Sequence, residues 1–195
     1  MTIILKDGTG TGNTAKVDVK NRIRAFSTVE TGGTEAAFSG DLYNVNTGTI
    51  VLTSATESAL VYMSNTDDVP WIFNRVFYNA GPSTGGAGDF RADVIANPTA
   101  GTLISAGTAL TPHNLNFSSS KGLTATTLKG AEGSTITDGT VRVSTIIPAS
   151  GTRVLIAFDS IILEPGSSIA VAITPQTGNT SMNIQVGFNL YRFIV

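Results

Sequence analysis

The chain of 195 residues contains no cysteine, a single histidine and few charged residues. Without cysteine it has neither a disulfide framework nor a thiolate metal site, and one histidine cannot build a histidine-rich metal site. Charged residues make up 13% of the chain, and the net charge is −2. Because general affinity for nucleic acid needs clustered lysine and arginine, this composition argues against a nucleic-acid partner.

Long hydrophobic runs are also missing. No apolar run approaches the roughly 20 residues that cross a membrane. The first residues, MTIILKD, lack the cationic region and the long apolar region of a signal peptide. We therefore expect no membrane association, and we expect synthesis inside a cell without a Sec-type export signal.

The chain does contain many short alternating segments that are separated by turn residues. Its 21 glycines and 7 prolines interrupt nearly every stretch that could form a helix, which leaves about ten strand-like segments. Strands at this spacing predict an all-β protein with a single antiparallel β-sandwich, and within that class a jelly roll. We expect an extended N-terminal arm over residues 1–15, followed by the sandwich over residues 16–195.

The last third of the chain carries the clearest strand signals. Pro165-Gly166 predicts a turn between two apolar runs, and hence a C-terminal hairpin. Residues 169–173 alternate large aliphatic side chains with alanines, so we expect a central strand that is covered on both faces. Residues 181–195 alternate until Leu190, where the phase slips towards Tyr191, Phe193 and Val195. That slip predicts a β-bulge near Leu190.

The aromatic residues fall into two expected groups. The group that we expect in the core comprises Trp71, Phe73 and Phe77. The second group exceeds what one core needs, so we expect it at interfaces between copies of the chain. It comprises Tyr62, Tyr78, Phe90 and Tyr191.

No pattern of residues indicates a catalytic or metal site. The glycine-rich stretch 8–12 precedes a strand rather than a helix, unlike phosphate-binding loops. His113 lies in a turn-like context, as surface histidines do, and Asp67-Asp68 matches no calcium loop. We therefore expect no enzymatic activity, no cofactor and no metal.

Two short segments near the N-terminus are candidates for contacts with another protein. Ile3, Ile4 and Leu5 precede a glycine- and threonine-rich run that buries too little to fold alone. They are interpreted as a docking anchor, with a frayed terminus as the alternative.

The second segment is a basic stripe, which alternation places on the outward face of one strand. It comprises Lys20, Arg22 and Arg24. Such a stripe suits an acidic protein surface or a phosphate backbone, and the alternative is a solvated strand face that protects a sheet edge.

Several stretches resemble structural proteins of tailed-bacteriophage particles. These are residues 6–18 (KDGTGTGNTAKVD), 43–50 (YNVNTGTI), 76–79 (VFYN) and 97–102 (NPTAGT). The turn at 163–169 (LEPGSSI) looks like those of jelly-roll virion proteins. Within this group the chain is most similar to head decoration, or cement, proteins.

The resemblance implies a function and partners. Decoration proteins are small β-rich domains, usually trimeric, whose terminal arm grips the capsid shell. It therefore implies a homotrimer that is made in the host cytoplasm, binds the major capsid protein and sits on the capsid surface of the virion. The alternative is a tail or fibre component that acts as a receptor- or carbohydrate-binding module through the loop at 81–88. A glycan hydrolase is a more distant alternative.

Overall fold

The structure, a computed structural model, describes residues 32–81, 89–148, 153–176 and 181–193, and only the backbone of residues 153–160. The chain divides into two units, Met1–Thr31 and Gly32–Val195. The expected arm, at 1–15, and the expected start of the sandwich, at residue 16, both lie outside the described residues. Every described helix and strand belongs to the second unit.

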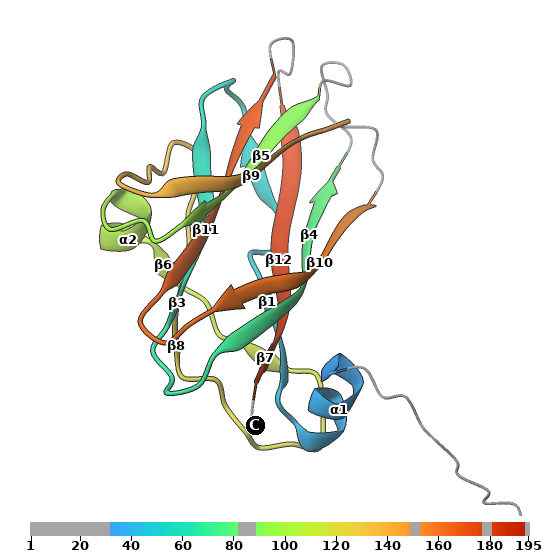
Figure 1. Ribbon diagram of the computed structural model, residues 1–195. Coiled ribbons are helices and arrows are strands. Elements are labelled where there is room, and N and C mark those ends of the chain that lie inside the picture. Colours follow the sequence, from blue (N-terminus) through green and yellow to red (C-terminus); the bar gives the residue numbers. More distant parts are fainter. Residues whose placement is uncertain (1–31, 82–88, 149–152, 177–180, 194–195) are drawn as a thin grey trace, which may run out of the picture. The chain divides into compact units, whose positions relative to one another are not determined.

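Gly32–Val195 forms a sandwich of two antiparallel sheets (Figure 1). The strands of the first sheet are β1 Leu42–Asn46, β2 Ile50–Leu52, β4 Trp71–Ala80, β7 His113–Asn114, β10 Arg153–Leu163 and β12 Met182–Arg192. Their order is β10-β4-β12-β1-β7, and β2 also pairs with β12. The strands of the second sheet are β3 Ser58–Asn65, β5 Phe90–Ala96, β6 Thr108–Ala109, β8 Ala125–Lys129, β9 Thr140–Ile147 and β11 Ser168–Pro175. Their order is β6-β8-β3-β11-β5-β9. The predicted antiparallel β-sandwich is confirmed.

The long strands pair in a nested order. β1 pairs with β12, β3 with β11, β4 with β10, and β5 with β9. The pairs β1–β12 and β4–β10 lie in the first sheet, and the pairs β3–β11 and β5–β9 lie in the second. The two sheets are therefore interleaved along the sequence.

The predicted turn at Pro165-Gly166 is confirmed, but it joins the two sheets. Gly166 has φ +78°, and the N–H of Ser167 donates to the carbonyl of Glu164 at 3.0 Å, as in a type II turn. Because β10 and β11 lie in different sheets, the expected C-terminal hairpin is wrong. Apolar runs on both sides of a turn predict two strands, but they do not specify which partners those strands take.

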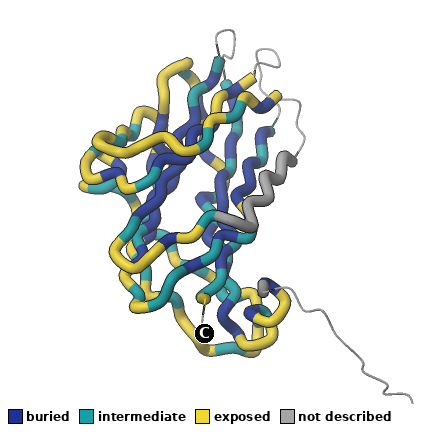
Figure 2. Tube along the Cα trace, in the orientation of Figure 1, coloured by how far each residue is buried: buried dark blue, intermediate teal, exposed yellow. Residues whose placement is uncertain are grey.

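β11 is a central strand, as residues 169–173 predicted. It lies between β3 and β5, and its large aliphatic side chains pack in the core between the sheets. Ala170 and Ala172 face the other side, where Leu103 of helix α2, Thr102–Ala106, packs in the same cluster. The small alanines leave room for that helix on the outer face. Figure 2 shows buried residues along the strands of both sheets.

The inner core contains two of the three aromatic residues that the sequence assigned to it. Trp71 and Phe73 are fully buried, and the ring of Phe73 meets that of Phe188 edge-on with centroids 5.3 Å apart. Phe77 is also buried, and a Cβ at position 187 would collide with its ring, so glycine is needed there. The core prediction is confirmed for Trp71 and Phe73, whereas Phe77 is buried outside that cluster, on the face of β4 opposite Val76 and Tyr78.

Three of the four aromatic residues that were expected at interfaces are buried within the chain itself. Tyr62, Tyr78 and Phe90 are 9%, 1% and 0% exposed, and Tyr191 is half-buried. The expectation is therefore wrong for Tyr62, Tyr78 and Phe90, which pack in the core between the sheets or in the second cluster beside α2, and it stays a prediction for Tyr191.

The predicted bulge occurs at the expected level but on the partner strand. Asn189 pairs with Arg75, whereas Leu190 pairs with Phe73, so the extra residue is Asn74 of β4. β12 keeps its alternation to Leu190, and Phe193 is 48% exposed instead of turning inward. Two short helices also form where the sequence indicated little room for any: α2, and α1, which spans Gly32–Ser39.

Candidate functional site

The residues that the sequence proposed for contacts with another protein lie outside the described part of the chain. They are Ile3, Ile4, Leu5, Lys20, Arg22 and Arg24. Residues 82–88 of the loop proposed for the receptor- or glycan-binding alternative also lie outside it. These assignments stay predictions.

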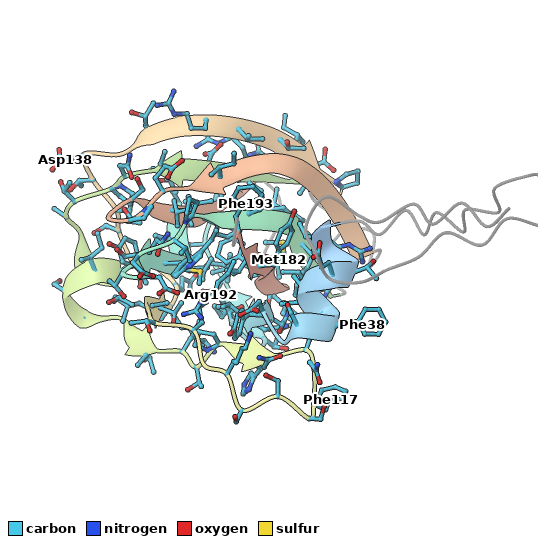
Figure 3. All side chains as sticks on the ribbon, turned by 60° about the horizontal axis from the view of Figure 1, so that its bottom comes forward. Phe38, Phe117, Asp138, Met182, Arg192 and Phe193 are labelled. Atoms are coloured by element: carbon cyan, nitrogen blue, oxygen red, sulfur yellow. The ribbon has the colours of Figure 1, made fainter. Side chains whose placement is uncertain are left out.

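Instead, the structure shows two strongly exposed phenylalanines at one end of the sandwich. The side chains of Phe38 and Phe117 are 77% and 96% exposed, which makes them the most exposed large apolar side chains of the described residues. Phe38 lies on α1 and Phe117 lies on the loop at 115–121, and both rings project outward (Figure 3). We call Phe38, Phe117 and the adjoining Leu115, which is 36% exposed, the aromatic end.

The helix that carries Phe38 ends in a Schellman motif. Gly40 has φ +76°, its N–H donates to Ala37, and the N–H of Asp41 donates to Ala36 at 2.7 Å. These bonds satisfy the last carbonyls of a helix of only eight residues. Phe38 is thereby held on a defined turn immediately before the start of β1.

The loop that carries Phe117 is held by asparagine side chains. Nδ2 of Asn114 donates to the carbonyl of Gly40 at 2.8 Å, and its Oδ1 accepts the N–H of Asn116 at 2.9 Å. Asn116 accepts the Ser118 hydroxyl at 2.8 Å, and its Nδ2 donates to the carbonyl of Phe38 at 3.2 Å. The helix and the loop that carry the two exposed rings are therefore linked by one hydrogen-bonded network. A pre-organised loop loses little entropy when it docks.

Gly40 also permits the close approach of this loop to the helix. A Cβ at Gly40 would overlap the hydroxyl of Ser119, and the positive φ independently favours glycine. The same residue thus ends α1 and makes space for the loop.

An ionic cluster around the buried Asp41 lies beside the aromatic end. The Asp41 side chain is 3% exposed, and its Oδ2 accepts a hydrogen bond from Lys121 at 2.7 Å. Arg192 lies 3.9 Å from Oδ1 and donates to Asp67 at 2.7 Å. Burial raises the pKa of Tyr43; Arg192 opposes this effect, whereas Asp41 and Asp67 reinforce it. Ion pairs of Asp41 with Lys121 and Arg192 therefore connect the residue before β1 with the loop and with the end of β12.

A hollow of about 410 Å³ adjoins this cluster. It is lined by Glu35 and Ser39 of α1, by Asp41 and Lys121, and by Arg192 and Phe193. Asp41 is engaged with Lys121 and Arg192, and Glu35, the other carboxylate of the lining, is exposed. A buried tyrosine with a raised pKa is a poor general base near neutral pH.

The other polar candidates from the sequence have ordinary settings. His113 is exposed on β7 and pairs with Asn44 of β1, and the N–H of Asp67 donates to the side chain of Asn65 in a turn. No group of three or more metal-ligating side chains occurs in the described ranges. No helix within those ranges is long and apolar enough to span a membrane.

Sequence reasoning missed the aromatic end because Leu115 and Phe117 alternate as strand residues do. The available signal was the spacing of Asn114, Asn116 and Ser118, whose side chains bind nearby backbone and favour a turn. Phe38 stands beside two alanines, and nothing in that pattern distinguishes an exposed ring from a buried one.

No protein-family model matches the chain, and a search of curated proteins finds no significant match.

Proposed function

We propose that the protein is a structural component of a phage particle, a decoration or cement protein that binds the outside of the head. Several copies would stabilise the shell through protein–protein contacts with the major capsid protein, without an enzymatic step. The virion assignment rests on the sequence resemblance. The observation that carries a binding role is the aromatic end, where two phenylalanines are presented to solvent by a hydrogen-bonded scaffold.

The strand connectivity supports a jelly roll. The pairs β1–β12, β3–β11, β4–β10 and β5–β9, distributed over two sheets, are those of a rolled antiparallel ribbon. Jelly rolls occur in viral capsid domains and in lectin domains. The fold therefore suits the proposed function and also its alternative.

The size of the aromatic end favours attachment by many weak contacts. With exposures of 77% and 96%, the two rings offer about 350 Å² if each ring can bury about 200 Å². A stable interface buries roughly 800 Å² on each partner. One aromatic end is too small for tight binding, but many copies on a repeating shell gain strength through effective concentration.

The proposal is tested with particles that lack the protein. Wild-type chain should bind them, and cryo-EM should place its density on the head. The double variant Phe38→Ser/Phe117→Ser should bind at least tenfold more weakly, because anchor residues contribute about 2 kcal/mol each. Ile146→Ser is the matched control, since Ile146 is 65% exposed and lies on β9.

The alternative function predicts a different location. A tail or fibre module would give density on the tail alone and would bind host glycans or a receptor. Density on the tail, or head binding that is unchanged in the double variant, would contradict the decoration role assigned to the aromatic end.

A further inference from the structure

A hollow of about 330 Å³ lies along one margin of the sandwich. Its lining includes residues of β9 and β10. Within the described strands, β9 pairs only with β5 and β10 pairs only with β4, so each is the outermost strand of its sheet (Figure 1). The hollow therefore lies where the two sheets end.

The wall of the hollow consists of aliphatic residues from both sheets. Val94, Leu163 and Ile169 belong to the buried inner core, whereas Val143 and Ile161 are half-buried and pack against it. The first sheet contributes two of these residues and the second contributes three. Small-ligand sites are concave and mostly apolar, with a few polar groups that fix the orientation of the ligand. We call these five residues the wall.

A β-bulge places an arginine beside the wall. Val94 pairs with Val143, and the next residue of β5, Ile95, pairs with Val141. Arg142 is therefore an extra residue on β9. The extra residue of a bulge departs from the regular alternation of side chains, and bulges re-aim side chains in this way. Val141 lies opposite Ile95, a residue of the outer cluster, whereas Arg142 lines the hollow with Val143.

The charge of Arg142 is available to a ligand. Arg142 is exposed, and it makes no ion pair or side-chain hydrogen bond with any described residue. Among the described residues of the lining it is the single charged one. The lining also contains Asn97 and Ser168, which are bonded to each other: Oδ1 of Asn97 accepts the N–H of Ser168 at 2.9 Å. The hollow thus combines an apolar wall with one cationic group.

We propose that the hollow binds a small monocarboxylate with an unbranched aliphatic body, such as a medium-chain fatty acid. The guanidinium of Arg142 binds the carboxylate through two parallel hydrogen bonds, and the aliphatic body packs along the wall. The hollow has the volume of about ten water molecules, and octanoate has about ten non-hydrogen atoms. This site shares no residue with the aromatic end, and it does not depend on the proposed attachment to a phage head.

The probe is octanoate, which is titrated into the isotope-labelled full chain and followed by the amide shifts in NMR spectra. The shifts should saturate with a Kd in the millimolar range and should include residues 142–143, 161–163 and 168–169. Octanol should bind about tenfold more weakly, because it fills the wall without a charge for the arginine. Each methylene removed from octanoate should weaken binding about fourfold.

Two variants separate the head group from the wall. Arg142→Gln should abolish the preference for octanoate over octanol, whereas Arg75→Gln, at an exposed arginine of β4 outside the lining, should retain it. Val143→Thr keeps the volume of the side chain and adds a hydroxyl to the wall, so it should weaken the binding of both probes alike. Because the preference is a ratio measured within one protein, a loss of stability does not imitate its disappearance.

Three results would overturn the proposal. The first is a set of amide shifts that do not saturate or that lie at the aromatic end. The second is a preference for octanoate that survives in Arg142→Gln, and the third is a Val143→Thr protein that binds octanoate as tightly as wild type.

Discussion

Phenylalanine occurs in two opposite settings in this molecule. In the interior, Phe73 and Phe188 are fully buried and meet edge-on between the sheets. At the aromatic end, the side chains of Phe38 and Phe117 are 77% and 96% exposed, although hydrogen bonds join the helix and the loop that carry them. The same side chain therefore stabilises the fold in one region and is available to a partner in the other. Burial, more than residue type, decides which role it has.

The largest expected effect comes from exchanging one ring in each region for alanine. Phe73→Ala should lower the free energy of unfolding by about 3–5 kcal/mol, because it removes buried area and leaves a cavity. Phe117→Ala should change it by less than about 0.5 kcal/mol. Urea denaturation followed by fluorescence measures both. Equal losses in the two variants would abolish the distinction.

The ionic cluster beside the aromatic end gives the next effect. Asp41→Ala should cost about 1–3 kcal/mol of stability, because Lys121 and Arg192 lose their shared buried carboxylate. Glu35→Ala is the control, since that exposed acid lines the same hollow. We also expect Asp41→Ala to weaken particle binding while both rings remain. If the Asp41→Ala variant is as stable as the Glu35→Ala variant, the ionic cluster does not support the aromatic end.

Gly40 provides a smaller test of how the loop is positioned. Gly40→Ala should cost about 1–2 kcal/mol, because alanine is strained at positive φ and its Cβ crowds Ser119. Gly122→Ala has open space around the added Cβ and should be neutral. Thermal unfolding of the two variants checks this. A Gly40→Ala protein as stable as wild type would show that the loop adjusts freely.

The smallest effect concerns a surface acid remote from both regions. The hydroxyl of Thr53, followed by its N–H and that of Ser54, holds the pKa of Glu132 below its usual value of 4.5. Because the pKa of Glu132 is lower in the folded chain than in the unfolded chain, its carboxylate contributes its full stabilisation above pH 4.5. This stabilisation is lost as the pH falls through the pKa of the folded state. Glu132→Gln should therefore flatten the acid limb of stability against pH slightly. Identical profiles for both proteins would contradict this role.

Local strand signals in the sequence were sufficient to predict much of the sandwich. The turn at Pro165-Gly166, the doubly covered strand at residues 169–173 and the buried Trp71 all follow from residue type and period. These features depend on neighbours along the chain or on one face of one strand. They can therefore be read without knowledge of pairing.

The features that could not be predicted from the sequence depend on contacts between segments that are distant along the chain. The alternation near Leu190 indicated a bulge, but the extra residue is Asn74, more than a hundred positions earlier. Tyr62 and Phe90 were assigned to interfaces because the number of buried layers was unknown. The aromatic end needs the loop at 115–121 to meet α1, and that meeting requires a glycine at position 40.

Hydrogen exchange of the chain, free and bound to particles, tests the central claim most directly. If the aromatic end is the attachment surface, amides of residues 38–40 and 115–119 should exchange more slowly on the particle, while amides of β9 beyond Val143 should be unchanged. Protection that is absent from both of those segments and present elsewhere in the sandwich would show that the protein binds through another surface.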